Sequence, residues 1–199
     1  PRSQGASVRN FGMIWPVGQA QGPAFDRAMR TREIWLEMSQ KANFFAEQTG
    51  SLHLAYTDLE VQVAQEYVTA MQGIKSASLL SPEQVQEKSP AAKQLHLKAG
   101  LWTEEELIID PREAMLQLGR YFENLPGVEI IWNKAISRIE GNSVYSGQQT
   151  WSADRIFVCS GVDFETLYPE LFEQTPITKC KLQMMRLAQQ PDNRSERIL

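Results

Sequence analysis

The stretch of sequence that decides the fold is Ala153-Asp154-Arg155-Ile156-Phe157-Val158-Cys159-Ser160-Gly161-Val162-Asp163. An apolar run that ends in small residues and glycine is typical of a buried parallel strand that delivers its backbone to a ligand. Because Gly161 has no Cβ, a flat cofactor or a phosphate group can touch the main chain there. The sequence therefore predicts a strand over Arg155–Cys159 that ends beside a ligand.

The segment before this strand has the order of elements of a mixed α/β fold. Asp110-Pro111 opens a predicted helix, and Pro126-Gly127 ends it before a predicted strand over Val128–Trp132. Three short strands then precede the strand that begins at Arg155; they are expected over 135–139, 143–145 and 149–152. We therefore predict that a three-stranded antiparallel layer is inserted between two parallel strands.

The first half of the chain predicts helices and strands in turn. Apolar residues at helical spacing predict a helix over Pro23–Phe45, and alternation predicts a strand over Ser51–Tyr56. Thr57 and Glu60 form a predicted capping box for a helix that ends near Gly73, and Ser81-Pro82 opens a shorter helix. Near the other end of the chain, Ile177–Leu187 is a candidate strand of a second sheet.

Composition indicates an ordinary globular protein. The chain has 199 residues, of which 42% are hydrophobic, and its formal net charge is -4 without a block of like charge. Nothing here favours nucleic acid as a partner, and no apolar run is as long as a membrane-spanning helix. The two histidines have no partners at metal-ligand spacing, so no metal is expected. Two cysteines favour a reducing, cytoplasmic compartment, with Cys159 as a small buried hydrophobic residue.

Several short motifs occur together in the order of a known family. Gly127-Val128-Glu129-Ile130, Ile136-Ser137-Arg138-Ile139, Ala153-Asp154 and Cys159-Ser160-Gly161 fit the pattern G-V-x-I, V-x-x-I, A-D-x-V-V-x-A-x-G-x-W. The sequence thereby resembles flavin-dependent amine oxidoreductases of the D-amino-acid oxidase, glycine oxidase and sarcosine oxidase family. Asp163 stands where that family often has tryptophan. The resemblance implies a partial FAD-binding, Rossmann-like domain interleaved with part of a substrate-domain mixed sheet.

The resemblance also implies which residues contact FAD. Ala6 and Ser7 would lie by the pyrophosphate, Phe11–Met13 along the isoalloxazine ring, and the main chain of Ile136 by the adenine. Ser160–Val162 would approach the ribose and phosphates, and Gly12 and Gly161 would mark backbone beside the cofactor. The whole set is Ala6, Ser7, Asn10, Phe11, Gly12, Met13, Ile136, Ser160, Gly161 and Val162. From the residues alone, a surface loop with two glycines is the alternative for the first segment.

The function implied by the resemblance is oxidation of the C–N bond of a small amine or amino acid. A hydride would pass to flavin N5, and water would hydrolyse the resulting imine. Catalytic residues are not assigned. The segment over 178–184 resembles the family's P-x-(K/R)-G-Q-M strand, where Lys181 would help oxygen react with the flavin, but a solvated basic residue explains Lys181 at least as well. Glu104–Glu106 are better explained as a solvated face. The segments over Gly5–Gln19 and Cys180–Arg186 resemble a bacterial subgroup associated with aminophosphonate breakdown, which favours a substrate like 2-aminoethylphosphonate. A binding module without catalysis is the alternative, and a hydroxylating flavin enzyme is disfavoured.

Two interleaved domains are expected. Residues 1–48 and 106–173 would form the FAD-binding domain, and residues 49–105 and 174–199 would form the substrate domain. The sequence contains no Gly-x-Gly-x-x-Gly match, which family members carry near the start. We therefore expect the chain to be an internal part of a longer protein that holds FAD only as a whole.

Overall fold

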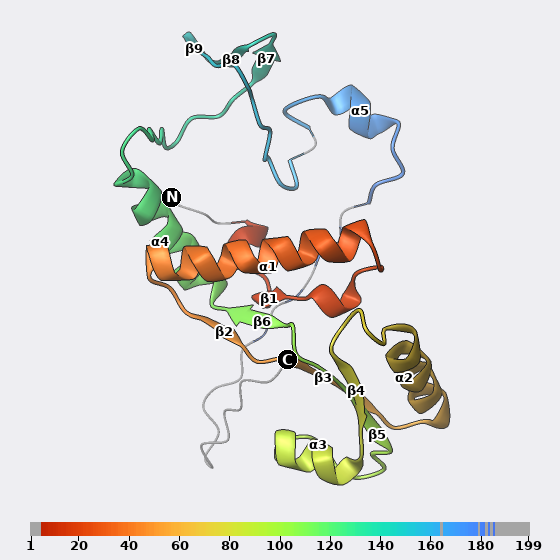
Figure 1. Cartoon of the computed structure of the whole chain (residues 1–199). Helices are drawn as coiled ribbons and strands as arrows, with labels where there is room; N and C mark the ends of the chain where they lie inside the picture. Colours follow the sequence, from red (N-terminus) through yellow and green to blue (C-terminus); the bar gives the residue numbers. More distant parts are fainter. Residues whose placement is uncertain (1–4, 164, 179, 182, 184, 186–199) are drawn as a thin grey trace.

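The computed structural model describes residues 5–163, 165–178, 180, 181, 183 and 185 (Figure 1). Its α-helices are α1 (Pro23–Ala42), α2 (Asp58–Ala70), α3 (Pro82–Lys88), α4 (Pro111–Glu123) and α5 (Pro169–Glu173). Two short 3₁₀ helices are η1 (Ala6–Val8) and η2 (Pro16–Gly18). The strands are β1 (Met13–Ile14), β2 (Ala46–Gln48), β3 (Ser51–Ala55), β4 (Ala77–Leu80), β5 (Ala99–Thr103), β6 (Leu107–Ile109), β7 (Arg138–Glu140), β8 (Ser143–Ser146) and β9 (Gln149–Ser152).

Within the described residues the strands form three antiparallel sheets of three strands each. Sheet A has the order β1-β6-β2, sheet B the order β3-β5-β4, and sheet C the order β7-β8-β9. Sheet C is the antiparallel layer predicted from the sequence, with Ile139 opposite Val144 and Val144 opposite Trp151. The mixed α/β class is confirmed, and its small sheets match part of the fold implied by the resemblance.

Helices α2, α3 and α4 begin where the sequence predicts because side chains cap their first turns. The Thr57 hydroxyl accepts from the Glu60 amide, and the Glu60 carboxylate accepts from the amide of Thr57. Ser81 and Gln84 form the same reciprocal box at α3, and Asp110 caps α4. Each side chain satisfies backbone donors that a helix start leaves unpaired.

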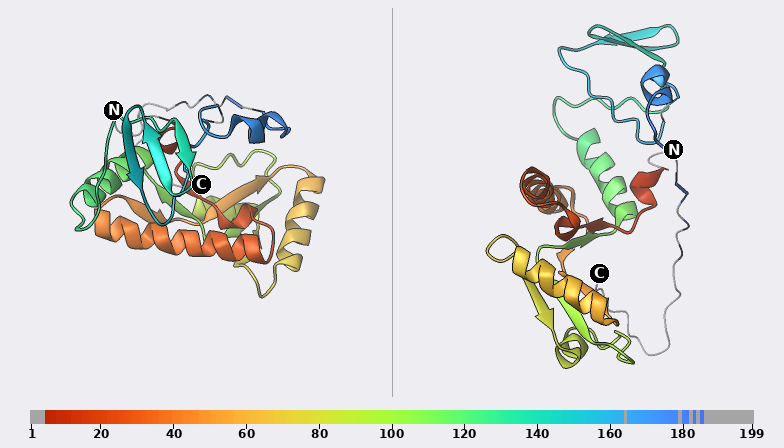
Figure 2. Two further views of the ribbon diagram at one scale, coloured as in Figure 1. Left: turned by 90° about the horizontal axis from the view of Figure 1, so that it is seen from above. Right: turned by 90° about the vertical axis from the view of Figure 1, so that its right-hand side faces the viewer.

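Helices α1 and α4 pack together beside sheet A, and a hydrophobic core lies between these helices and the sheet (Figure 2). Ala42, Phe44, Ile109 and Ala114 are buried at the centre, and Trp35 packs edge-on against Phe44 with ring centroids 6.0 Å apart. Helix α1 ends three residues before the predicted Phe45, because Asn43 adopts a left-handed conformation, and the amide of Phe44 returns to the Ser39 carbonyl. Phe44 can therefore enter the core from outside the helix.

Sheet B packs against α3 through a close contact at its central strand. Val85 is fully buried, and a Cβ added to Gly100 would come within 2.5 Å of the Val85 side chain. Glycine at this position of β5 therefore lets the helix approach the sheet. Helix α2 contacts all three strands of the same sheet.

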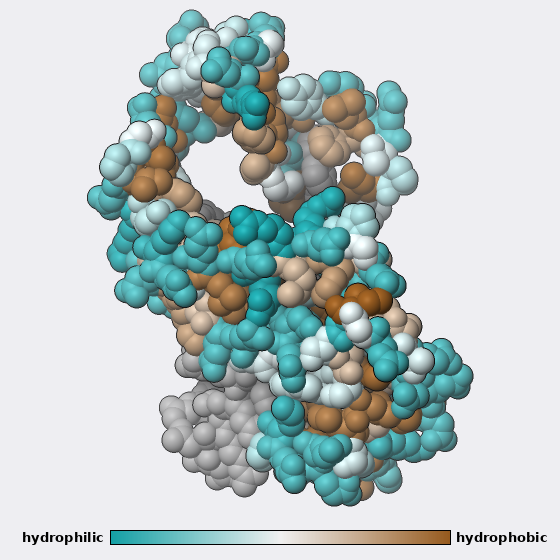
Figure 3. All heavy atoms as spheres, in the orientation of Figure 1, coloured by the Kyte–Doolittle hydropathy of each residue, from teal (hydrophilic) through white to brown (hydrophobic). Residues whose placement is uncertain are grey.

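The strands predicted over Val128–Trp132 and Arg155–Cys159 are absent from the structure of the described residues. A strand requires a hydrogen-bonded neighbour, and no described segment pairs with either stretch. Without a covering layer, Phe157 is 82% exposed, and Val158 and Val162 are exposed as well. Apolar atoms lie at the surface of the upper part of the molecule (Figure 3). The prediction that Cys159 is buried is wrong for the same reason, since its side chain is exposed.

The last predicted strand, Ile177–Leu187, falls partly outside the described residues, and its described positions are not in a strand. Across the part of the chain that the structure describes, no helix has the length and apolar character needed to cross a membrane.

Candidate functional site

The loop that carries the first predicted cofactor contacts is held in shape by Asn10. The Asn10 side-chain amide donates to the carbonyls of Ala6 (2.8 Å) and Ser7 (3.1 Å) and accepts from the Gly12 amide (2.8 Å). These bonds occupy the polar atoms of Asn10. Its observed role is therefore to fix the loop, while the neighbouring side chains of Ser7, Phe11 and Met13 stay exposed.

Gly12 is required by the protein fold itself. Its φ is +72°, and an added Cβ would lie 2.1 Å from the Ile109 carbonyl oxygen on β6. The Gly12 carbonyl in turn accepts from the Ile109 amide at 2.9 Å. We expected steric contact with a cofactor to explain this glycine, but the backbone of β6 is the group that a side chain would strike.

The predicted contacts lie around separate hollows. Ser7, Asn10, Gly12 and Met13 line one of about 220 Å³, next to Trp35. Ile136 and Ser160 line another, of about 340 Å³, with apolar walls from sheet C and residues 156–159. Asn10 and Phe11 also border a wider hollow of about 660 Å³. The residues beyond these hollows are Ala6, Gly161 and Val162, all of them exposed.

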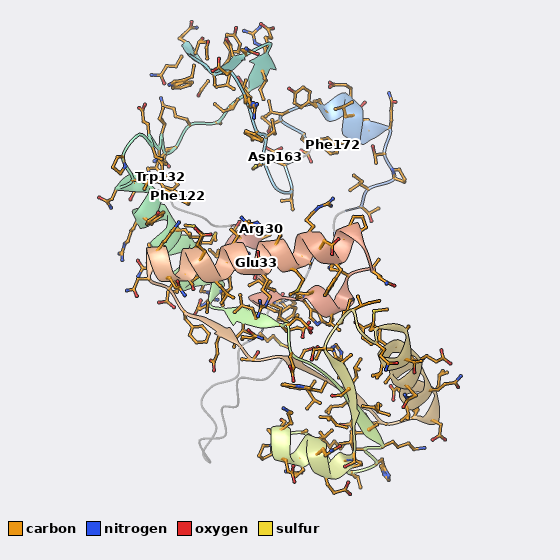
Figure 4. All side chains as sticks on the ribbon, viewed as in Figure 1. Arg30, Glu33, Phe122, Trp132, Asp163 and Phe172 are labelled. Atoms are coloured by element: carbon orange, nitrogen blue, oxygen red, sulfur yellow. The ribbon has the colours of Figure 1, made fainter. Side chains whose placement is uncertain are left out.

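The turn after residue 159 has open backbone. Gly161 has φ +65°, and an added Cβ would meet nothing within 4 Å. Asp163, which stands where the family often has tryptophan, accepts from the amides of Glu165 (3.2 Å) and Thr166 (3.1 Å) and so stabilises this turn (Figure 4). The main chain of this turn is therefore accessible, as are the exposed side chains of Phe11 and Met13 beside the first hollow.

A buried polar chain lies next to this loop, and the sequence did not reveal it. Glu106 is fully buried, not solvated as predicted, and its Oε2 accepts from the Thr103 hydroxyl at 2.5 Å. The Thr103 oxygen is 2.8 Å from the Ser51 hydroxyl, which is 3.2 Å from His53 Nε2. The His53 ring stacks on Trp15, with centroids 5.5 Å apart and planes at 11°. One feature of the sequence does indicate that Ser51 and His53 lie close together, because they are two residues apart and share a face of a predicted strand.

The other Glu106 oxygen clamps η2, the turn that follows β1. Glu106 Oε1 accepts from the Val17 amide at 2.9 Å. The Val17 carbonyl accepts from both the Tyr67 hydroxyl (3.0 Å) and the Lys75 ammonium (3.1 Å). Lys75 also donates to the Gln19 carbonyl at 2.8 Å. Both polar groups of the Val17 backbone are thus held by side chains from distant segments.

Burial dominates the electrostatics of this cluster. It lowers the pKa of the His53 imidazole, with the Glu106 carboxylate opposing the shift, so the ring is neutral near pH 7. Burial likewise lowers the pKa of Lys75, against the pull of Glu105 and Glu106, and raises the pKa of Tyr67. Within the described residues, no three His, Cys, Asp or Glu side chains are grouped so as to hold a metal ion.

Comparison with known proteins identifies the class to which this fold belongs. The chain matches the family model described as DAO, FAD dependent oxidoreductase, over residues 1–198. It therefore belongs to this family, whose cofactor is FAD. Among curated proteins, none matches the chain significantly.

Solved structures support the same fold. Glycine oxidase from Geobacillus kaustophilus superposes with a TM-score of 0.65 at 17% identity, covering 75% of this chain and 44% of that one. Glycine oxidase from Bacillus cereus ATCC 14579 gives 0.61 at 18% identity, with coverage of 74% and 42%. L-Amino acid deaminase from Proteus myxofaciens gives 0.63 at 16%, with coverage of 72% and 34%. The chain thus spans less than half the length of each of these proteins.

Proposed function

We propose that this chain forms part of an FAD-dependent oxidoreductase that oxidises the C–N bond of a small amine or amino acid. The observation that carries the proposal is the family match over residues 1–198. The exposed loop beside Trp35, which lines a hollow of about 220 Å³, supports the proposal that the flavin contacts this loop. Similar structures include proteins named glycine oxidase and L-amino acid deaminase, which favours nitrogen-bearing substrates.

In this proposal, different residues contact different parts of FAD. Phe11 and Met13 would contact the ring system, Ala6 and Ser7 the pyrophosphate, and the Ile136 backbone the adenine. Ser160–Val162 would approach the ribose and phosphates, with Asn10 and Gly12 shaping the first loop. Bound flavin supplies the acceptor for the hydride that leaves the carbon next to nitrogen, and the protein orients that C–H bond.

Finer assignments complete the proposal. An aminophosphonate such as 2-aminoethylphosphonate is the substrate favoured by the loop over Gly5–Gln19, and the cytoplasm is the compartment favoured by the use of only two cysteines. Whole-protein FAD binding is proposed to require segments in addition to this chain. A binding module that holds no flavin is the second candidate.

The experiment measures flavin content and its reduction under anaerobic conditions by glycine, other amino acids and 2-aminoethylphosphonate. We expect a Phe11→Ser variant to lose most of its flavin absorbance while its circular dichroism stays unchanged, because Phe11 is 64% exposed and outside the core. Leu59→Ser is the matched control, since Leu59 is 69% exposed on α2.

The outcomes separate the candidates. A protein that contains flavin reduced by an amine supports the proposal. A flavin that responds only to an alcohol or hydroxy acid excludes C–N oxidation, and a full-length protein with no flavin leaves the binding module. Equal flavin loss in the Phe11 and Leu59 variants would remove the loop from the site.

A further inference from the structure

With Glu106 ionised, the hydrogen bonds that link Glu106, Thr103, Ser51 and His53 have one consistent direction. The carboxylate of Glu106 has no hydrogen to donate, so the Thr103 hydroxyl must give it its single hydrogen. The Thr103 oxygen is then the acceptor for the Ser51 hydroxyl. With its hydrogen spent on Thr103, Ser51 can only accept from His53, so Nε2 of the imidazole carries the proton. In the neutral ring, Nδ1 is left with a lone pair.

This direction is fixed in a dry environment. Ser51 is 2% exposed, Thr103 is 1% exposed and Glu106 is fully buried, so water does not compete for their hydrogen bonds. Ser51 and Thr103 lie directly opposite each other in the β3–β5 ladder, and His53 follows two residues along β3 on the same face. The register of β3 and β5 therefore sets the distances between the side chains of Ser51, Thr103 and His53. The stack on Trp15 fixes the plane of the His53 imidazole.

His53 and Trp15, at the exposed end of this hydrogen-bonded series of side chains, lie close in the structure to the loop that would contact the flavin. Trp15 comes two residues after Met13, and β1 places Met13 and Ile14 against β6, the strand that follows Glu106 directly. Trp15 is 41% exposed, and His53 is half-buried. Trp15 and His53 are outside the lining of the hollows beside Phe11–Met13, so only a substrate that extends from that loop past Trp15 would reach the stacked Trp15–His53 pair.

From these contacts we propose that His53 binds the amino group of the substrate, with Nδ1 accepting a hydrogen bond from an N–H. This inference deepens the proposed function and rests on it, since it names the residue that recognises the nitrogen. Ser51, Thr103 and Glu106 are positioning residues that act through the His53 tautomer. The lowered pKa of His53 agrees, because an imidazolium has no lone pair for an amine.

The first test reads the tautomer directly. Long-range proton–nitrogen NMR correlations distinguish the two neutral forms of each histidine, and the chain has only two histidines, His53 and His96. A His96→Gln variant assigns the signals. We expect Nε2–H at His53 in the wild-type protein. A proton on Nδ1 instead would overturn the inference, whatever the enzyme oxidises.

Thr103→Val provides a change that touches no substrate. Valine keeps the shape of threonine and removes the acceptor of Ser51, so the Ser51 hydroxyl turns to His53 Nε2 and the proton moves to Nδ1. We expect the NMR pattern to switch and kcat/KM for the amine to fall with it. Should this variant not fold, Ser51→Ala removes the same link, and we then expect a mixture of the two tautomers.

The second test is kinetic and uses the flavin-loaded protein. His53→Gln should lower kcat/KM for the amine on the order of 2- to 10-fold, the effect of losing a hydrogen bond between two neutral groups, with flavin content unchanged. His96→Gln should match the wild type. An amine that reduces the flavin equally fast in the His53 variant overturns this inference alone, whereas reduction by no amine overturns the proposed function as well.

Discussion

At the scale of single residues, Glu106 shows how one buried charge organises a site. Its two carboxylate oxygens accept from Val17 on one side and from Thr103 on the other. Glu104, Glu105 and Glu106 are consecutive and identical in type, so the sequence does not indicate which of them is buried. Glu104 is exposed and Glu105 is half-buried, with its carboxylate accepting from the amide of Ser76. The identity of the buried residue depends on the register of β5 and β6.

We expect Glu106→Gln to destabilise the protein by about 1–3 kcal/mol. Glutamine keeps the shape but has one accepting oxygen, so either Val17 or Thr103 loses its acceptor in a buried place. The measurement is the free energy of unfolding in urea. Glu104→Gln is the matched control and should change stability by less than about 0.5 kcal/mol. Equal losses in the two variants would contradict the role given to Glu106.

His53 predicts a dependence of stability on pH. Its pKa is lowered in the folded protein from an ordinary value of 6.5, mainly by burial. The unfolded chain therefore binds more protons in the window below 6.5, and the free energy of unfolding falls as the pH drops through it. His53→Gln should make the stability curve flatter between pH 6.5 and 5 than that of the wild type. An unchanged slope in the variant would show that His53 titrates alike in both states.

At the scale of elements, local signals placed the helix starts correctly because capping is a matter of a few neighbouring residues. Thr57, Ser81 and Asp110 all cap the helices predicted after them. Strands behaved differently: the segment over Ser143–Ser146 pairs on both sides, while Val128–Trp132 pairs with nothing described. An apolar segment becomes a strand only when another strand lies beside it.

The cap of α2 gives a prediction for a single element. Thr57→Ala should lower the free energy of unfolding by about 1 kcal/mol, because the Glu60 amide loses its acceptor. Thr69→Ala on the same helix removes only a hydroxyl that donates back to the Gln65 carbonyl, so it should be nearly neutral. Thermal unfolding of the two variants makes the comparison, and a similar shift in both would argue against the capping box.

At the scale of the whole molecule, the three sheets differ in how they are supported. Sheets A and B each pack against helices, whereas sheet C stands with α5 above α1 and α4 (Figure 1). All strands of sheet B come from residues 51–103, and those of sheet A come from either side of that range. This arrangement is compatible with the proposed interleaving of residues 1–48 and 106–173 with residues 49–105 and 174–199.

We expect hydrogen exchange in the 199-residue chain to reflect this difference. Amides of sheet C should exchange faster than those of β5 and β6, because a small sheet with little apolar cover opens without unfolding the rest. Mass spectrometry of peptides from Arg138–Ser152 and from Ala99–Ile109 gives the comparison. Slower exchange in the first peptide would mean that sheet C is held by contacts stronger than those seen.

The sequence by itself determined the helix caps, the hairpin layer of sheet C and the family, because each depends on residues close together in the chain or on short motifs in order. The cofactor contacts over Ala6–Met13 and Ser160–Val162 were predicted from that order and stay predictions. Only the tertiary structure decided that the backbone of β6 leaves no room for a side chain at Gly12. It also decided that Glu106 and His53 belong to one series of hydrogen bonds. Those facts depend on which distant strands meet and in what register, and burial and hydrogen-bond direction follow from that meeting.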